Sequence, residues 1–420
     1  MSKLTKFSSE DIISDLPESI IDSILTKLPV KDAVRTCVLS SKWKYQWTTM
    51  TQLVFDEKCL CLSNDKKVAE KELVDFVMRF LLLHDGPIQK FKLSTSYLQK
   101  STDIDQWLRV ISRKNIKEIV LDVYGGKWRW SDPRFSTPRS IFSLRKLTGL
   151  TLSEFAVKPP LGFQGFPCIK YLELHGVTIT LEVIENLISG CPLLEKFKFS
   201  HWNKLAFAIR APNLKLLTVK GNLEDFYLEH TPLVVAFSIN FYPLAWRGNV
   251  LKKVPVTYDY LKFIEIGKMD FKDTDEVLYV LQLLLQSPNL QDLQISSPDL
   301  EMEEREIIAC GEEPNDFQYR TADFDIWERN CPTDFTFKCL KTVKLSYICT
   351  KHDVEFVKFL LGRSPVLEVI SISPDYEYGE PMRMLPDLIA HMEKISFSNM
   401  WILQDFDRDL LLYYLVNFNA

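Results

Sequence analysis

Leu147-Thr-Gly-Leu150-Thr-Leu152 carries the pattern apolar-x-x-apolar-x-apolar, and the same pattern returns at Ile169-Lys-Tyr-Leu172-Glu-Leu174 and at Leu194-Glu-Lys-Phe197-Lys-Phe199. Alternate residues of a strand point to one face, so each copy predicts a half-buried β-strand. Further copies lie at 88–93, 116–121, 214–219, 261–266, 290–295, 340–345, 367–372 and 392–397, with weaker copies at 50–55 and around Leu233. The chain is therefore built from repeats.

The spacing of the copies indicates how the repeats are arranged. Most neighbouring copies start between 20 and 29 residues apart, for example at 147, 169, 194 and 214, and again at 261 and 290. This is the range of leucine-rich repeats, in which no single unit closes its own core and neighbouring units stack. The sequence predicts an α/β fold, a degenerate leucine-rich-repeat solenoid with a curved parallel β-sheet and with helices and coil on its convex side.

Segments with helical spacing of apolar residues precede several strands and stop at a proline, which cannot continue a helix. They are 181–188 before Pro192, 276–285 before Pro288 and 354–361 before Pro365. Between 190 and 234 the connections shorten to Ala211-Pro212-Asn-Leu and Thr231-Pro232-Leu, so coil is expected there in place of helices.

Residues 299–334 interrupt the repeat pattern and contain twelve acidic residues and three arginines. A solvated loop explains this insertion, and so does an acidic lid or partner contact.

The amino-terminal residues differ from the repeats. Residues 11–47 read DIISDLPESIIDSILTKLPVKDAVRTCVLSSKWKYQW. A first helix is expected to begin at Pro17 and to end before Pro29, a second to begin near Lys31, and a third to be capped by Ser40. Such a small helical unit carries more apolar surface than it can cover alone, which favours docking against a partner helix.

These residues resemble the F-box in its common plant form. The resemblance rests on Leu16-Pro17, Ile24-Leu25, Leu28-Pro29-Val-Lys31-Asp-Ala33-Val34 and Val38-Leu39-Ser40-Ser41-Lys42-Trp43. With the repeats, and with Phe337-Lys-Cys-Leu-Lys-Thr-Val343 and Glu355-Phe-Val-Lys-Phe-Leu-Leu361, the whole chain is similar to plant F-box proteins with leucine-rich repeats and a carboxy-terminal FBD segment. The implied domains are an F-box at 1–50, the solenoid at 51–330 with its acidic insertion at 299–334, and FBD-like repeats continuing the solenoid at 331–420.

The resemblance implies a substrate-recognition subunit of a Skp-cullin-F-box ubiquitin ligase. The F-box would dock on a Skp-type adaptor and through it reach a cullin and a RING subunit, while the repeats bind a protein target for ubiquitination. An interaction scaffold acting outside any ligase is the alternative. The family pattern assigns the adaptor contact to Leu16, Pro17, Ile20, Ile24, Leu28, Val38 and Trp43. Leu25, Val34 and Trp47 are instead expected to form the module's own core.

Composition limits the other functions that the chain could have. The formal net charge of −5 disfavours a nucleic-acid binder, and no apolar run reaches the length of a membrane span or secretory signal, so an intracellular location in nucleus or cytoplasm is expected. The nine cysteines form no Cys-x-x-Cys pair, the six histidines are scattered, and the glycines form no phosphate-binding loop. We therefore expect no metal, no cofactor and no catalysis.

Overall fold

The computed structural model describes residues 13, 15–57, 65–98, 101–123, 135–240, 257–298, 321–348 and 350–374, and the backbone of strands at 401–406 and 410–414. Side chains at 101, 202–207, 222–227 and 374 are outside this description. Contacts divide the chain into two units, Met1–Ile179 and Thr180–Ala420, and each is considered by itself.

The first unit opens with four short helices, α1 Glu18–Leu25, α2 Val30–Arg35, η1 Thr36–Val38 and η2 Trp43–Thr49. The first two confirm the predicted helices. The third predicted helix is a 3₁₀-helix and lacks the expected side-chain cap: the Trp43 N–H donates to the Ser40 carbonyl at 3.2 Å, and the buried Ser40 Oγ has no partner in the part of the chain described.

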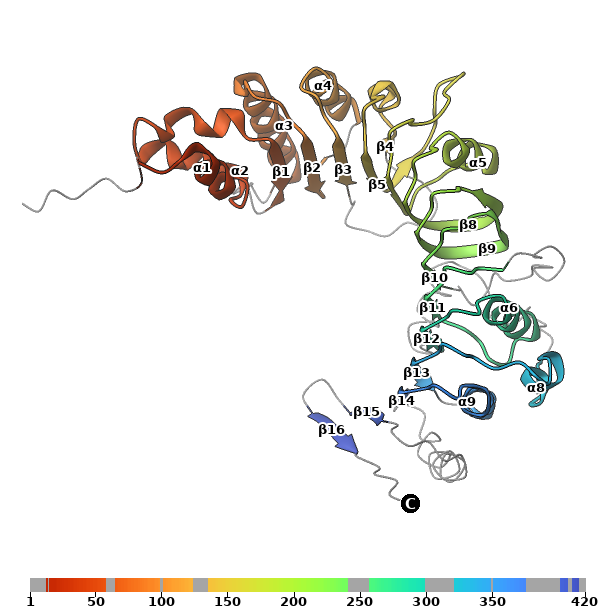
Figure 1. The fold of residues 1–420 in the computed structure, drawn as a ribbon. Helices are drawn as coiled ribbons and strands as arrows, with labels where there is room; N and C mark the ends of the chain where they lie inside the picture. Colours follow the sequence, from red (N-terminus) through yellow and green to blue (C-terminus); the bar gives the residue numbers. More distant parts are fainter. Residues whose placement is uncertain are drawn as a thin grey trace, which may run out of the picture. The chain divides into compact units, whose positions relative to one another are not determined.

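A parallel ladder follows, in which strands pair in chain order (Figure 1). Its strands are β1 Gln52–Asp56, β2 Lys90–Thr95, β3 Glu118–Val123, β5 Gly149–Ser153 and β7 Tyr171–His175. Leu53, Phe91, Ile119, Leu150 and Leu172 stand in one register row and are all buried. The repeats predicted in this unit, including the weaker copy at 50–55, are therefore confirmed.

Helices lie on one side of this ladder (Figure 1). Helix α3, Lys66–Leu83, is capped by the Asp65 carboxylate, which accepts from the N–H groups of Lys67 and Val68. Helix α4, Ser101–Ile111, and the 3₁₀-helix η4, Arg139–Ser143, occupy the same layer in the next repeats. A small second sheet pairs β4 Phe135–Ser136 with β6 Phe155–Ala156.

The second unit contains the helices α5 Leu181–Ser189, α6 Thr274–Leu285, α8 Ile326–Asn330 and α9 Lys351–Arg363. Its ladder contains β8 Lys196–Arg210, β9 Leu216–His230, β10 Ala236–Asn240, β11 Phe263–Gly267, β12 Asp292–Ser296, β13 Thr342–Ile348, β14 Val369–Pro374, β15 Trp401–Phe406 and β16 Leu410–Tyr414. Helices α5, α6 and α9 end two or three residues before Pro192, Pro288 and Pro365, as predicted. The copy predicted at 392–397 lies outside the described residues.

Three features of this unit differ from expectation. The short connections at 211–215 and 231–235 are turns without a helix, as expected, but the strands before them are longer than expected: β8 and β9 each run for 15 residues and pair in parallel, with register shifts after His201. At the first shift a Cβ on Gly221 would clash with the His201 carbonyl oxygen, and Gly221 has a φ of 135°, so only glycine fits. At the other end, β16 is antiparallel to β15 and departs from the parallel solenoid.

The third difference concerns the acidic insertion. Its residues 299–320 lie outside the description. Within 321–334 the charged side chains are exposed, but Ala322, Ile326, Trp327 and Cys331 are buried. Trp327 on α8 is 2% exposed, and its ring centroid lies 4.4 Å from that of Phe356 on α9. The Arg363 guanidinium, also on α9, donates to the carbonyls of Pro332 (3.2 Å) and Thr333 (2.8 Å). This part of the insertion is structural.

No helix in the described ranges has the length and apolar character required to cross a bilayer. Five cysteines are described, and all have free thiols; Cys191 and Cys331 are buried, and Cys37, Cys168 and Cys339 are partly exposed.

Candidate functional site

Helix α1 has two apolar faces. It begins after Pro17, whose carbonyl accepts hydrogen bonds from the N–H groups of Ile20 (3.0 Å) and Ile21 (3.1 Å). Residues four apart share a helix face, and Ile21 and Leu25 are buried together. Ile20 and Ile24 form the neighbouring face and are 46% and 37% exposed. One apolar face therefore anchors α1, and the second is uncovered.

The other predicted adaptor contacts differ in exposure. Pro17 and Val38 are exposed, Val38 to 83%, and Leu16 and Leu28 are half-buried. Trp43 is only 2% exposed, and its Nε1 donates to the Ile13 carbonyl at 3.0 Å. The Trp43 indole is therefore part of the module's own core.

Two hydrogen bonds from η2 hold the segment that leads into α1. Besides the Trp43 bond, Lys42 Nζ donates to the Leu16 carbonyl at 2.6 Å. Lys42 and Trp43 thus hold the backbone at Leu16 and Ile13, directly before Pro17, while Ile20 and Ile24 lie one turn apart on α1 and Val38 lies on η1. Of the residues expected in the core, Leu25 is buried and Val34 and Trp47 are partly exposed.

The exposed apolar side chains are concentrated in this module. Between residues 13 and 45, six large ones are exposed, more than in any other described stretch of that length: Ile13, Ile20, Ile24, Val38, Leu39 and Tyr45. Contiguous apolar exposure marks interaction sites. Sequence reasoning missed Ile13 and Tyr45, which stand outside the motif, and did not select Leu39, which is inside it.

The helical module is joined firmly to the first repeat. The Thr48 carbonyl accepts hydrogen bonds from the N–H groups of Asp85 (2.9 Å) and Gly86 (3.1 Å). The Trp47 ring lies 5.1 Å from Phe80 of α3. A Cβ on Gly86 would approach Thr49 Cα to 2.8 Å, so a side chain there would push the two parts apart.

His84 lies in the same junction and makes the stability of this junction depend on pH. The ring Nε2 is 2.8 Å from the Met50 carbonyl, and Nδ1 is buried without a partner in the described residues. Burial lowers the pKa of His84 from 6.5, and Lys114 adds to this effect, while the Met50 carbonyl and Asp85 oppose it. The unfolded chain therefore binds a proton near pH 6.5 that the folded chain binds only at lower pH.

We accordingly expect full stability above about pH 6.5 and a loss as the pH falls below it. The melting temperature of the full chain, measured from pH 7.5 to 5.5, should fall less in His84→Gln than in the wild type. His175→Gln, which changes a half-exposed histidine of the same unit, is the control for the loss of one histidine. An equal fall in the His84 variant would show that His84 is not the source of the pH dependence.

Comparison with known proteins agrees with these observations. A family model described as "F-box domain" matches residues 13–53, and a model described as "FBD-associated F-box protein At5g56370, LRR repeats" matches residues 104–242. The chain is 39% identical to the Arabidopsis thaliana F-box/FBD/LRR-repeat protein At1g13570 over 94% of its own length and 99% of that protein. The chain belongs to the F-box/FBD/LRR-repeat family. It is also 28% identical to the Arabidopsis thaliana F-box/LRR-repeat protein At4g14096, over 70% of this chain and 63% of that protein.

Membership of the F-box/FBD/LRR-repeat family identifies the helical module at 13–53 as the F-box. F-box domains generally bind Skp-type adaptors, and proteins that combine them with leucine-rich repeats act in protein–protein interaction. No group of three or more potential metal-ligating side chains is found in the described parts of the chain.

Proposed function

We propose that the protein is the substrate-recognition subunit of a Skp-cullin-F-box ubiquitin ligase. In this proposal the F-box binds a Skp-type adaptor, the adaptor connects to a cullin and a RING subunit, and the repeats hold a protein target. The chain itself is non-catalytic, because ubiquitin transfer belongs to the enzyme that the RING subunit carries. We place this activity inside the cell, in the nucleus or the cytoplasm or both.

The uncovered face of α1 is the observation that carries the proposal. Complete burial of an isoleucine side chain contributes roughly 1.5 to 3 kcal/mol. Ile20 and Ile24 are already partly covered, so each gains less, but Val38 and the half-buried Leu16 and Leu28 add to the same contact in the family pattern. Together they can offset the entropy lost when two proteins associate.

The junction between the F-box and the first repeat also supports a receptor role. Backbone hydrogen bonds at Thr48, the Trp47–Phe80 contact and the His84–Met50 contact fix the F-box on α3 and the strands beside it. An adaptor bound to α1 would therefore stand in a defined position relative to the first repeats. A flexible tether would not give the repeats this control over the position of a bound target.

The test is recovery of ligase subunits from plant cells with the tagged full chain, scored by mass spectrometry. We expect a Skp-type adaptor and a cullin with the wild type, and neither with the variant Ile20→Glu/Ile24→Lys. Recovery of the adaptor without a cullin would favour the alternative, a scaffold outside the ligase, and recovery of neither would refute the proposal. Point variants are preferable to deletion of residues 1–50, because deletion would remove the Thr48 and Met50 carbonyls that bind the first repeat.

A further inference from the structure

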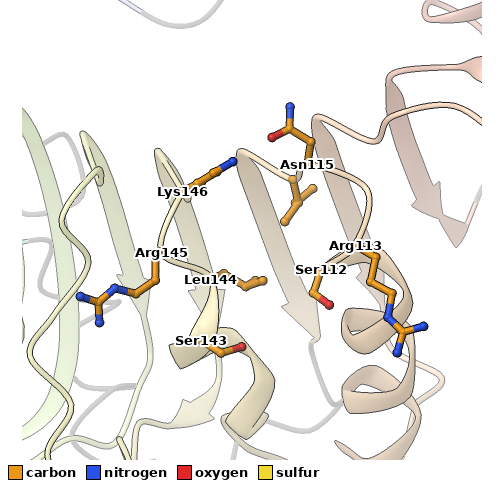
Figure 2. A pocket seen from close by; sticks show the side chains of 8 residues that line it. Ser112, Arg113, Asn115, Ser143, Leu144, Arg145 and Lys146 are labelled. Carbon is orange, nitrogen blue, oxygen red and sulfur yellow. The ribbon is translucent and has the colours of Figure 1, made fainter.

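An open pocket of about 400 Å³ lies at the edge of the first unit where strands β3 and β5 begin (Figure 2). The turn between α4 and β3 forms one wall, and the turn between η4 and β5 forms the other. Ile116 and Leu144 contribute buried apolar side chains from the two turns. This surface is distinct from the α1 face, and the inference below does not depend on adaptor binding.

The remaining lining is basic and polar. Arg113 comes from the first turn, Arg145 and Lys146 come from the second, and no acidic residue lines the pocket. All three cationic side chains are exposed, and none of them has a hydrogen bond or ion pair to any described residue. By contrast, Lys90 on neighbouring β2 is paired with Glu118 at 2.6 Å. The protein as a whole carries a net charge of −5, so this basic edge is a local feature.

The backbone beneath these side chains is held in place. The Lys117 carbonyl accepts from the N–H groups of Thr148 (2.7 Å) and Gly149 (3.0 Å), which ties the two turns together. The Lys114 carbonyl accepts from the Ile88 N–H at 2.8 Å. Asn115 adopts a left-handed conformation with φ of 63°, which asparagine tolerates better than most residues. The cationic side chains therefore extend from fixed positions.

The directions of the charged groups select the kind of ligand. Figure 2 shows the guanidinium groups of Arg113 and Arg145 pointing away from each other at opposite sides of the pocket, with the Lys146 side chain toward Asn115. Binding a single phosphate or sulfate requires converging donors, as in bidentate arginine sites. Diverging charges instead suit a ligand whose negative charges are spread along a chain. Charge complementarity between such a ligand and exposed basic side chains raises the specificity and the association rate of binding.

We propose that this pocket binds an acidic segment of a partner protein, with carboxylates spaced along an extended chain. Arg113 and Arg145 would meet acidic side chains at the two ends of the segment, and Lys146 would meet one between them. The apolar lining from Ile116 and Leu144 would accept an uncharged side chain of the same segment.

The probe for this proposal is a fluorescein-labelled peptide of alternating glutamate and leucine, titrated with the full chain and followed by anisotropy. Peptides with glutamine in place of glutamate, and with lysine in place of glutamate, are tested in parallel. We expect binding of the glutamate peptide alone, weakening as salt increases because exposed charges are screened. The variant Arg113→Glu/Arg145→Glu/Lys146→Glu should weaken it by at least about tenfold.

A matched variant separates the local effect from total charge. Lys66→Glu/Lys67→Glu/Lys71→Glu changes the net charge equally on exposed positions of α3 in the same unit, and its melting temperature checks that α3 stays folded. We expect its affinity to stay within about twofold of the wild type. Equal loss in both variants, equal binding of the glutamine peptide, or no binding at all would overturn the proposal. Displacement by inorganic phosphate beyond that by potassium chloride of equal ionic strength would also overturn it, because it would indicate a small-anion site.

Discussion

Replacing Ile20 by glutamate together with Ile24 by lysine should reduce the affinity of the full chain for a Skp-type adaptor by at least about 100-fold. A factor of 100 corresponds to about 2.8 kcal/mol of binding free energy. The variant loses the burial of two isoleucines, and binding would also have to desolvate the two introduced charges, so a loss of this size is expected. The measurement is the dissociation constant for purified adaptor by calorimetry.

The two substitutions are chosen so that α1 itself keeps its stability. Both positions are exposed in the free chain, and glutamate followed four residues later by lysine forms the favourable helical pair, worth about 0.2 to 0.5 kcal/mol. Ser19→Glu/Ser23→Lys places the same pair on an adjacent exposed face and is the control. We expect the control to bind within about threefold of the wild type. If the isoleucine variant bound equally well, the α1 face would not be the adaptor contact.

The repeats could be predicted from the sequence because their signal is periodic and local. Each buried strand residue, such as Leu150 or Leu172, has its partner two residues away on the same face, and this alternation is preserved in every clear copy. The helix ends could be predicted for a similar reason, since Pro192, Pro288 and Pro365 act on their own segment of chain.

The errors arose where distant residues decide the structure. The short connection after β8 is the predicted turn, but pairing with β9 keeps the residues before it in strand up to Arg210, where coil was expected. Segment 321–334 is acidic, but Trp327 finds Phe356 and Phe359 on α9, and Arg363 holds the Pro332 and Thr333 carbonyls. Such contacts join residues that are far apart in the sequence, so the composition of one segment cannot predict them.

Within the F-box, the family pattern assigned the exposed Ile20, and not the buried Ile21, to the adaptor contact, but it also assigned the buried Trp43 to that contact. Ile20 and Ile21 are adjacent and equally apolar, yet one is exposed and the other buried, because a helix turns by about 100° per residue. Trp43 resembles a contact residue in the motif, but its indole is buried and donates to the Ile13 carbonyl, in the segment that leads into α1. Only the packing of η2 against that segment makes the difference visible.

The second large effect is expected at Trp327. Its ring lies 4.4 Å from Phe356, 5.7 Å from Phe359 and 6.4 Å from Phe271, so it joins α8 to α9 and to the turn before α6. Trp327→Ala would leave a cavity among these rings, and truncations of this kind cost about 3 to 5 kcal/mol. We expect a loss of that size in the free energy of unfolding, measured by urea titration of the full chain.

The control for Trp327 comes from the same segment. Phe324 is 53% exposed and stacks on His352 with a centroid distance of 4.5 Å, so Phe324→Ala removes an aromatic ring at the surface without opening the core. We expect that variant to lose less than about 1 kcal/mol, in line with exposed substitutions. If Trp327→Ala cost as little as Phe324→Ala, segment 321–334 would be only loosely attached, and the solvated-loop interpretation of the insertion would apply to it after all. A large difference between the two variants would instead show that α8 is part of the folded repeat. The charged residues of segment 321–334 would then lie beside a buried aromatic cluster.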